Sequence, residues 1–267
     1  MSGEGSQPKS TRTRPAPATP GPGTLYIVGT PIGDPDDITI RALRILRTAP
    51  IIAAEDPRST QALLAYHGIT GGIARNVTSY GPANLEEKIS LLLRRLGRGE
   101  AVALVSDSGM PVIHDPGCSL IAAARRAGIP VTCVPGPSAL TAAAALSGFS
   151  ADHIVFDGHP PTARQRLAPF LRQRCGGRST SIFFVEDRAV TPMLETLAAI
   201  LPTRMILLAQ NLTMEDEWIR RGTAPSLLKQ EVRLRRGRKR EMKTTVVVEG
   251  AMTGTRPADR RKVGRSA

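Results

Sequence analysis

Short apolar strand patterns alternate with amphipathic helix patterns along most of this chain, and this alternation constrains the fold more than any other feature. The run "LYIV" at residues 25–28 is typical of a strand buried on both faces, and it stops at Gly29. The next segment, residues 37–47, carries apolar residues at helical spacing: Ile38, Ala42, Ile45 and Leu46. The residues off that stripe include three arginines: Arg41, Arg44 and Arg47.

The same alternation continues through the first half of the chain. Apolar strands are expected at 51–55, 101–106 and 130–134, and amphipathic helices closed by glycine at 87–99 and 119–128. Apolar strands separated by helices are typical of a parallel, doubly wound sheet covered by helices on both faces. This half is therefore predicted to be an α/β domain.

The pattern changes after the Pro-Gly-Pro sequence at 135–137, which we interpret as a hinge. Strands are then expected at 153–156, 180–186, 204–210, 218–223 and 244–250, with helices near 162–174, 190–201 and 224–234. This order predicts a second α/β domain with a mixed sheet. The predicted organisation is a disordered basic tail, two α/β domains and a second disordered basic tail, at residues 1–23, 24–136, 137–250 and 251–267.

Composition excludes several classes of protein. Three cysteines in 267 residues are too few and too scattered for a disulfide framework or a zinc site, so no metal is expected. No apolar run approaches the roughly 20 residues of a membrane span. The first 23 residues have no apolar region of the kind found in signal peptides, so a cytoplasmic protein is expected.

The positive charge is concentrated near the ends of the chain. The net charge is +13, and residues 229–267 alone carry 13 Lys/Arg against four acids. Basic tails on a nearly neutral core indicate a polyanionic partner such as RNA, although a solvated tail is the simpler alternative. Aromatic residues make up only 3% of the chain, which argues against a base-stacking platform for single strands.

The loop "GTPIGD" after the first strand is not a phosphate-binding motif. It lacks the spacing of a dinucleotide fingerprint and the Lys of a P-loop. Asp34 would repel phosphate, and Pro31 and Pro35 remove N–H donors that an anion would need. The loop therefore suits a ligand that is poor in phosphate, or it is a plain strand-to-helix turn.

Four loops rich in Gly, Pro and acid follow strands of the first domain: "GTPIGD", "EDPRST" (55–60), "SDSGMPVIHDPG" (106–117) and "PGPSA" (135–139). The carboxyl ends of parallel strands are where ligands bind in open α/β sheets. Further short motifs occur in the second half of the chain: "FFVE", "LT" at 212–213, Glu217, "RGT" and "VVVEGA". Together with the four loops, they make residues 24–250 resemble proteins of the tetrapyrrole methylase superfamily. Within it they are similar to the branch that methylates a cytidine ribose 2′-hydroxyl of small-subunit (16S) rRNA.

The resemblance implies a homodimer of two-domain subunits with S-adenosylmethionine in the cleft between the domains, and small-subunit rRNA or the small ribosomal subunit as partner. Matching by motif implies these cofactor contacts: Ile32, Gly33, Asp107, Met110, Ser138, Ala139 and Ala209. Methyl transfer from a sulfonium needs mainly alignment, and a ribose hydroxyl needs a base or a polarising group. The candidates for that catalytic role are Glu55, Asp56, Arg58 and Glu186. The simpler alternatives are helix capping for the acids and a surface ion pair for Arg58.

The chain departs from the family pattern mainly on the expected substrate side. Residues that differ from the usual motifs there are Pro57, Ser59, Val185, Gln210, Asn211 and Met214, and Met110 replaces a Thr. The basic segment 233–243 can compensate in RNA affinity. Two alternatives stay open: a methyltransferase of the same superfamily on another substrate, and a non-catalytic relative that binds RNA or ribosomes.

Overall fold

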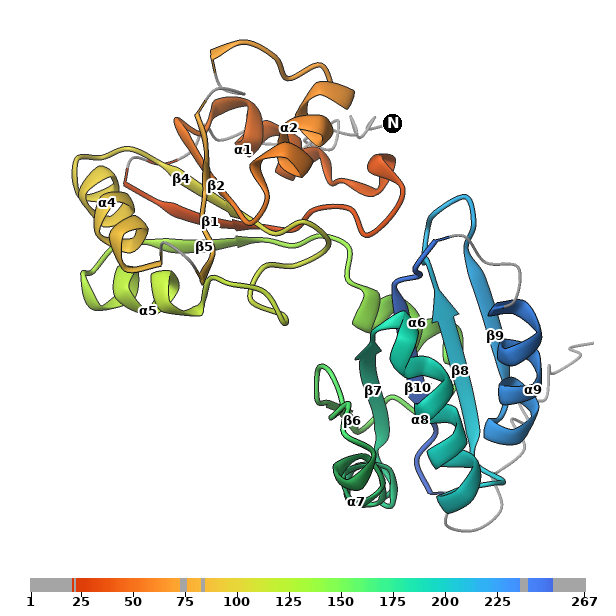
Figure 1. Cartoon of the computed structure of the whole chain (residues 1–267). Coiled ribbons are helices and arrows are strands. Elements are labelled where there is room, and N and C mark those ends of the chain that lie inside the picture. Colours follow the sequence, from red (N-terminus) through yellow and green to blue (C-terminus); the bar gives the residue numbers. More distant parts are fainter. Residues whose placement is uncertain (1–20, 22, 73–75, 83–84, 236–239, 252–267) are drawn as a thin grey trace, which may run out of the picture. The chain divides into compact units, whose positions relative to one another are not determined.

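The computed structural model describes residues 21, 23–72, 76–82, 85–235 and 240–251, and the chain folds into two compact units (Figure 1). The first unit holds the chain up to Gly29 and residues 38–136, and the second holds residues 30–37 and the chain from Pro137 onward. The loop at 30–37, expected in the N-terminal domain, thus packs with the second unit. Except for residues 21, 23 and 251, the tails expected to be disordered lie outside the described residues.

The first unit contains a sheet of five parallel strands in the order β3-β2-β4-β1-β5. Its strands are β1 (Leu25–Val28), β2 (Ile51–Ala54), β3 (Val77–Ser79), β4 (Val102–Val105) and β5 (Val131–Val134). β1 lies between β4 and β5, and Leu25 is the register partner of both Val102 and Val131. β1, β2 and β4 are buried at every residue, as their continuous apolar sequences predict.

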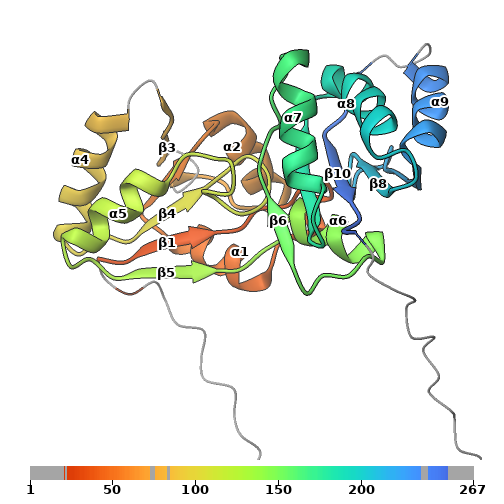
Figure 2. The same ribbon diagram turned by 90° about the horizontal axis from the view of Figure 1, so that it is seen from below.

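Helices cover both faces of this sheet. α1 (Ile40–Thr48) and α2 (Pro57–Tyr66) pack on one face, where Ala42, Leu46 and Leu64 join its apolar cluster. α4 (Leu85–Gly97) and α5 (Cys118–Arg126) pack on the other, through residues that include Leu92, Leu96 and Leu120. Figure 1 shows α1 above β1 and β5 and α5 below them, and Figure 2 shows the same unit from below. The predicted doubly wound parallel sheet is confirmed.

The first helix begins later than its apolar spacing predicts. Residues 35–37 form a 3₁₀ turn, η1 (Pro35–Asp37), in which the Asp36 N–H donates to Asp34 Oδ1 at 2.9 Å. Thr39 then caps α1, because its Oγ1 accepts the Ala42 N–H at 3.1 Å. Ile38 is buried like the other apolar residues of the stripe, although it precedes the helix.

The second unit contains a mixed five-stranded sheet in the order β6-β7-β10-β8-β9. Only β6 and β7 are parallel, and the other neighbours are antiparallel. The strands are β6 (Ile154–Phe156), β7 (Thr180–Val185), β8 (Met205–Gln210), β9 (Trp218–Thr223) and β10 (Thr244–Val248). The mixed sheet predicted for the second domain is confirmed.

Helices also cover both faces of the second sheet. α7 (Arg164–Cys175), α8 (Asp187–Ile200) and α9 (Ala224–Arg235) contribute to the apolar cluster on one face, for example through Leu171, Leu194 and Leu227. The other face packs against α6 (Ala139–Ser147) and against Ile32 from the loop at 30–37. This loop therefore belongs to the second unit through a buried side chain. None of the described helices is long and apolar enough to cross a membrane.

Candidate functional site

The carboxyl edge of the first sheet gathers the acidic loops that the sequence singles out. All five strands are parallel, so the loops after β2 and β4 leave from the same edge. The Asp56 N–H donates to Asp107 Oδ1 at 3.0 Å, which joins the two loops directly. Two of the predicted site residues, from segments about fifty positions apart, are thus brought into contact.

Glu55 lies in this acidic group, and its carboxyl holds its proton more tightly than a free glutamate does. Partial burial raises the pKa of Glu55, and the neighbouring carboxylates of Asp115, Asp107 and Asp56 raise it further. A hydrogen bond from the Asp107 backbone acts in the opposite direction. A carboxylate with a raised pKa is a stronger base than a free one, which suits proton abstraction.

Asp56 and Arg58 form the start of α2. Asp56 Oδ1 accepts the Arg58 N–H at 2.9 Å, so Asp56 caps the helix. Pro57 occupies the first helical position, where the N–H that proline lacks would have no partner within the helix. The departure at Pro57 is therefore well accommodated by the backbone. The Arg58 side chain is exposed.

The loop at 106–117 has an unusual backbone. Val112 and His114 have φ values of 76° and 71°, which non-glycine residues rarely adopt and which are costly for a β-branched residue. Ser106 Oγ donates to the Gly109 carbonyl at 3.2 Å within the same loop. Such strain is concentrated at ligand-binding and catalytic sites in proteins.

Two glycines bring the loops after β1 and β5 into backbone contact. A Cβ on Gly29 would lie 2.7 Å from the Gly136 Cα and equally close to Met110 Sδ. Glycine is therefore required at this approach, and Met110, from the loop after β4, packs against it. Close packing within the protein therefore explains why glycine is required at position 29. A bound phosphate is not needed to explain it.

Three of the predicted cofactor residues share an apolar cluster in the second unit: Ile32, Ala139 and Ala209. Gly33 is packed next to them, since a Cβ there would lie 2.5 Å from the Leu212 carbonyl oxygen and 2.6 Å from Thr213 Oγ1. The Asp34 N–H donates to Thr213 Oγ1 at 3.0 Å. The loop at 30–37 is thus held against the turn that follows β8.

The sequence alone gives that turn no role, although "LT" at 212–213 and Glu217 belong to the matched motifs. Asn211 and Thr213 have φ values of 49° and 63°. The Thr213 N–H donates to Glu217 Oε2 at 2.8 Å, and Asn211 Nδ2 donates to Asp216 Oδ2 at 2.9 Å. Side chains within the turn therefore stabilise a backbone that presents the Thr213 hydroxyl to Asp34.

Ser138 and Glu186 both occupy helix N-cap positions in the second unit. Ser138 precedes α6 and forms no side-chain capping bond within the part of the chain that the structure describes. Glu186 precedes α8, and its Oε2 lies 2.7 Å from Arg188 Nε in an exposed ion pair. Glu186 belongs to the second unit, whereas Glu55, Asp56 and Arg58 belong to the first.

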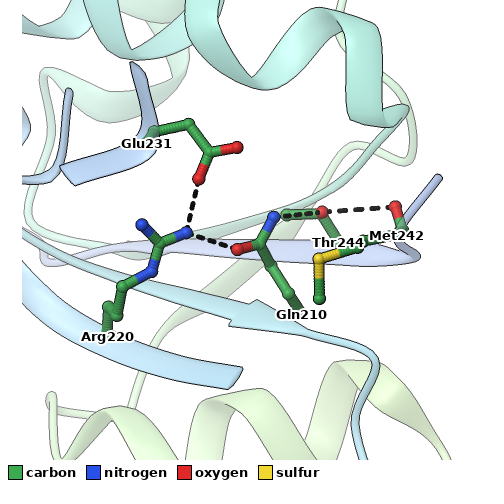
Figure 3. Close-up of polar contacts among 5 residues, drawn as sticks. All are labelled: Gln210, Arg220, Glu231, Met242 and Thr244. Carbon is green, nitrogen blue, oxygen red and sulfur yellow. Dashed lines mark hydrogen bonds and ion pairs between the residues drawn. The ribbon is translucent and has the colours of Figure 1, made fainter. Parts of the chain in front are cut away.

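A buried polar network adjoins the same turn (Figure 3). Arg220 on β9 donates through Nη2 to Gln210 Oε1 and forms an ion pair of 2.5 Å with Glu231 Oε2 on α9. Gln210 Nε2 in turn donates to Thr244 Oγ1 at 3.3 Å. Gln210 is thus held between Arg220 on the neighbouring strand and Thr244 on β10. Gln210 is one of the residues that depart from the motifs of the resemblance.

No cluster of His, Cys, Asp and Glu suited to a metal ion occurs among the described residues.

Comparison with known proteins extends the matched motifs to most of the chain. A family model described as Tetrapyrrole (Corrin/Porphyrin) Methylases matches residues 24–228. The chain is 40% identical over 234 residues to "Ribosomal RNA small subunit methyltransferase I" of Xylella fastidiosa (strain Temecula1), covering 86% of this chain and 82% of the relative. Proteins of the same name are 40% identical over 202 residues in Thermotoga maritima and 36% over 240 residues in Escherichia coli O157:H7. These two alignments cover 75% and 89% of this chain, and 88% and 82% of the relatives.

Solved structures share the fold at low sequence identity. A cobalt precorrin-4 methyltransferase of cobalamin biosynthesis is similar with a TM-score of 0.62 and 21% identity, covering 85% of this chain and 95% of that chain. A diphthine synthase is similar with a TM-score of 0.61 and 18% identity, covering 85% and 90%. Both likenesses concern the α/β architecture.

Proposed function

The chain belongs to the tetrapyrrole (corrin/porphyrin) methylase family, and on this premise we propose that it is an S-adenosylmethionine-dependent methyltransferase that methylates a cytidine ribose 2′-hydroxyl in 16S rRNA. The observation that carries the proposal is the 36–40% identity to relatives named ribosomal RNA small subunit methyltransferase I, over 75–89% of the chain. The net charge of +13 supports a polyanionic substrate.

The chemistry of the candidate loops fits this cofactor. S-adenosylmethionine carries a cationic sulfonium and an amino group but no phosphate, and when bound it supplies a methyl group that is already activated for displacement. The loops at 29–37 and 106–117 contain acids and neither lysine nor arginine. We assign its contacts to the residues implied by the motifs: Ile32, Gly33, Asp107, Met110, Ser138, Ala139 and Ala209. A location in the cleft between the domains stays a prediction.

Among the predicted catalytic residues, Glu55 is the one that we assign as the base. Its raised pKa favours proton uptake from the ribose hydroxyl, whereas Glu186 is already paired with Arg188. Asp56 caps the start of α2, and its backbone N–H donates to Asp107. This second bond fixes the position of the loop after β2 relative to the loop after β4. Arg58, exposed on the first turn of that helix, is assigned to a phosphate of the RNA.

The proposal also includes the assembly and location of the enzyme. We propose a homodimer, which sedimentation equilibrium of the purified chain tests directly. An rRNA substrate implies a cytoplasmic enzyme. The basic segment 233–243, proposed to add RNA affinity, lies partly outside the described residues.

The experiment that tests the function has two stages. Calorimetric titration with S-adenosylmethionine should give saturable binding of one molecule per subunit. Purified small ribosomal subunits, prepared from cells lacking this methyltransferase, are then incubated with the protein and labelled cofactor, and the labelled nucleoside is identified by mass spectrometry. A 2′-O-methylcytidine in 16S rRNA is the expected product.

The other outcomes separate the alternatives. Cofactor binding with label on a porphyrinoid and none on RNA would transfer the assignment to a tetrapyrrole substrate. A folded protein that binds small subunits but no cofactor would be a non-catalytic relative. Label on the base instead of the ribose would keep the methyltransferase and overturn the 2′-O assignment.

A further inference from the structure

The outer face of α1 carries a row of arginines that the proposed chemistry does not use. Arg41, Arg44 and Arg47 recur at every third position, so successive members are neighbours on the helix surface. The opposite face of the helix buries Ala42, Ile45 and Leu46 against the sheet. The helix contains no acidic residue. We call this row the α1 arginine face.

Some arginines of other helices have a carboxylate partner, whereas those of the α1 arginine face, like Arg125 and Arg126 of α5, have none among the described residues. Arg164, Arg174 and Arg188 each form an ion pair, with Glu195, Asp157 and Glu186 respectively. None of the ion pairs among the described residues includes an arginine of the α1 face. Asp36 and Asp37 precede the helix in η1, and they form no such pair either. No arginine of this face is therefore in an ion pair within the described structure.

The placement of Arg41 is unfavourable for the helix itself. Arg41 is the second residue of α1, where the partial positive charge of the helix N-terminus repels a cation. The two arginines of α5, Arg125 and Arg126, lie in its last turn, where the helix dipole favours them. Helix stability thus explains the arginines of α5 and leaves Arg41 unexplained.

Exposed apolar and aromatic side chains flank the α1 arginine face. Ile40, the first residue of α1, is 66% exposed, and Tyr66, the last residue of α2, is 59% exposed. Arg47 Nη2 donates to the His67 carbonyl at 3.3 Å, which places the end of α2 beside the end of the arginine row. Guanidinium groups bind phosphates, and an exposed tyrosine can pack on a ribose or a base.

From this arrangement we propose that the α1 arginine face is a docking surface for the sugar-phosphate backbone of the RNA. The occupant follows from charge complementarity, since the face combines guanidinium groups that have no carboxylate partner among the described residues with an exposed aromatic residue. The proposal rests on the proposed rRNA methylation and names a contact surface for that substrate on the first unit.

Charge reversal on two opposite faces of the same sheet tests the proposal. The full chain is prepared as the wild type, as R41E/R44E, and as the matched control R125E/R126E, which changes the net charge equally on α5. Arg47 is left intact because it contacts α2. Binding to purified small ribosomal subunits and to a 16S rRNA transcript is measured at several KCl concentrations, and S-adenosylmethionine binding is measured by calorimetry.

We expect R41E/R44E to bind subunits and transcript at least about tenfold more weakly than the wild type. The slope of log K for binding against log [KCl] should become shallower by about 1–2. R125E/R126E should lose less than about threefold. The substitution R41K/R44K should retain most of the affinity, since lysine keeps the charge. Cofactor binding should be unchanged in all variants.

Each other result overturns the proposal in a distinguishable way. Equal losses in R41E/R44E and R125E/R126E would mean that net charge alone attracts the RNA. A loss on intact subunits but not on the transcript would mean that the face meets a ribosomal protein. Unchanged binding by R41E/R44E, with methylation intact, would reject the surface and keep the proposed function. A wild-type chain that binds neither subunits nor transcript would overturn both.

Discussion

The two units place charged side chains in opposite ways. In the first unit, the carboxylates of Glu55, Asp56 and Asp107 gather at the open edge of the sheet, where partial burial and then the neighbouring carboxylates raise the pKa of Glu55. In the second unit, Arg220 and Glu231 are buried between a strand and a helix as a pair of opposite charges. Exposed like charges adjust protonation and ligand binding, whereas a buried opposite pair fixes one arrangement of the chain. The first arrangement should therefore govern activity and the second stability.

The largest effect is expected at the base. Glu55→Gln should lower kcat by about 10²–10⁴-fold, because it removes the proposed proton acceptor, and it should leave cofactor binding unchanged. In the wild type, activity should fall with decreasing pH as Glu55 becomes protonated. Since its pKa is raised, this acid limb should lie above the ordinary value of 4.5. Initial rates of methyl transfer between pH 4.5 and 9 measure both effects.

Asp115→Asn provides the control for this prediction, because it removes a carboxylate that raises the pKa of Glu55. The acid limb should move to lower pH, while the plateau rate at high pH changes little. A Glu55→Gln enzyme with the wild-type pH profile would show that another group accepts the proton.

In the second unit, Arg220→Met should reduce the free energy of unfolding by about 3–5 kcal/mol, because it leaves the Glu231 carboxylate buried without its cation. Urea unfolding followed by circular dichroism measures this loss. Fluorescence of Trp218, the only tryptophan of the chain, reports on the same strand, since Arg220 lies over its ring.

Two further variants complete the comparison. R220M/E231L removes both charges and should recover much of the lost stability. Arg58→Met in the first unit, at an exposed position, should change stability by no more than about 0.5 kcal/mol. If Arg220→Met costs less than about 1 kcal/mol, the buried pair does not fix the second unit.

Sequence patterns predicted the sheets well because buried strands have a local signature. The apolar runs at 25–28 and 51–54 and the segment 218–223 became strands within a residue of their predicted bounds. The sequence pattern does not predict the helix at 139–147, because its run of alanines has no amphipathic period and is apolar on nearly every side. The short strand β3 was missed because three partly buried residues give too short a pattern.

The candidate site was less predictable because its contacts join distant segments. The motifs propose Glu55, Asp107 and Gly33 as site residues, but the bond from the Asp56 N–H to Asp107 depends on the strand order. The role of Thr213 depends on a contact with Asp34, 179 positions earlier in the sequence. Likewise, nothing local indicates that Arg220 reaches Gln210 and Glu231.

Substitution of glycine by alanine tests how closely the backbone is packed in each unit. Gly33→Ala and Gly29→Ala should each cost about 1–3 kcal/mol, since the new methyl group would meet backbone atoms at 2.5 Å and 2.7 Å. Gly97→Ala, with no neighbouring atom within 4 Å, should not destabilise the chain. Chemical denaturation gives all three values. Equal stability of all three variants would contradict the packing described for both loops.

A smaller effect is expected from Asp107→Asn. Loss of the carboxylate should raise the Kd for S-adenosylmethionine about tenfold, equivalent to about 1.4 kcal/mol, because the cationic groups of the cofactor lose a counter-charge. RNA affinity should change less. Asp152→Asn is the control in the second unit, since its Oδ2 likewise accepts one hydrogen bond and it belongs to none of the loops assigned to the cofactor. Equal losses of cofactor and RNA affinity in Asp107→Asn would remove Asp107 from the cofactor site.

The last prediction requires no substitution, because each unit contains cysteine. Cys118 and Cys133 of the first unit are exposed, whereas Cys175 is buried on α7. Burial raises the pKa of the Cys175 thiol to about 11, so its thiolate is scarce at neutral pH. With a thiol reagent at pH 8, two cysteines per chain should react rapidly, and the third only when the second unit opens. Peptide mapping of the labelled sites identifies them, and Arg220→Met should speed the third reaction more than the first two. Fast labelling of Cys175 in the wild type would mean that the second unit opens readily despite its buried ion pair.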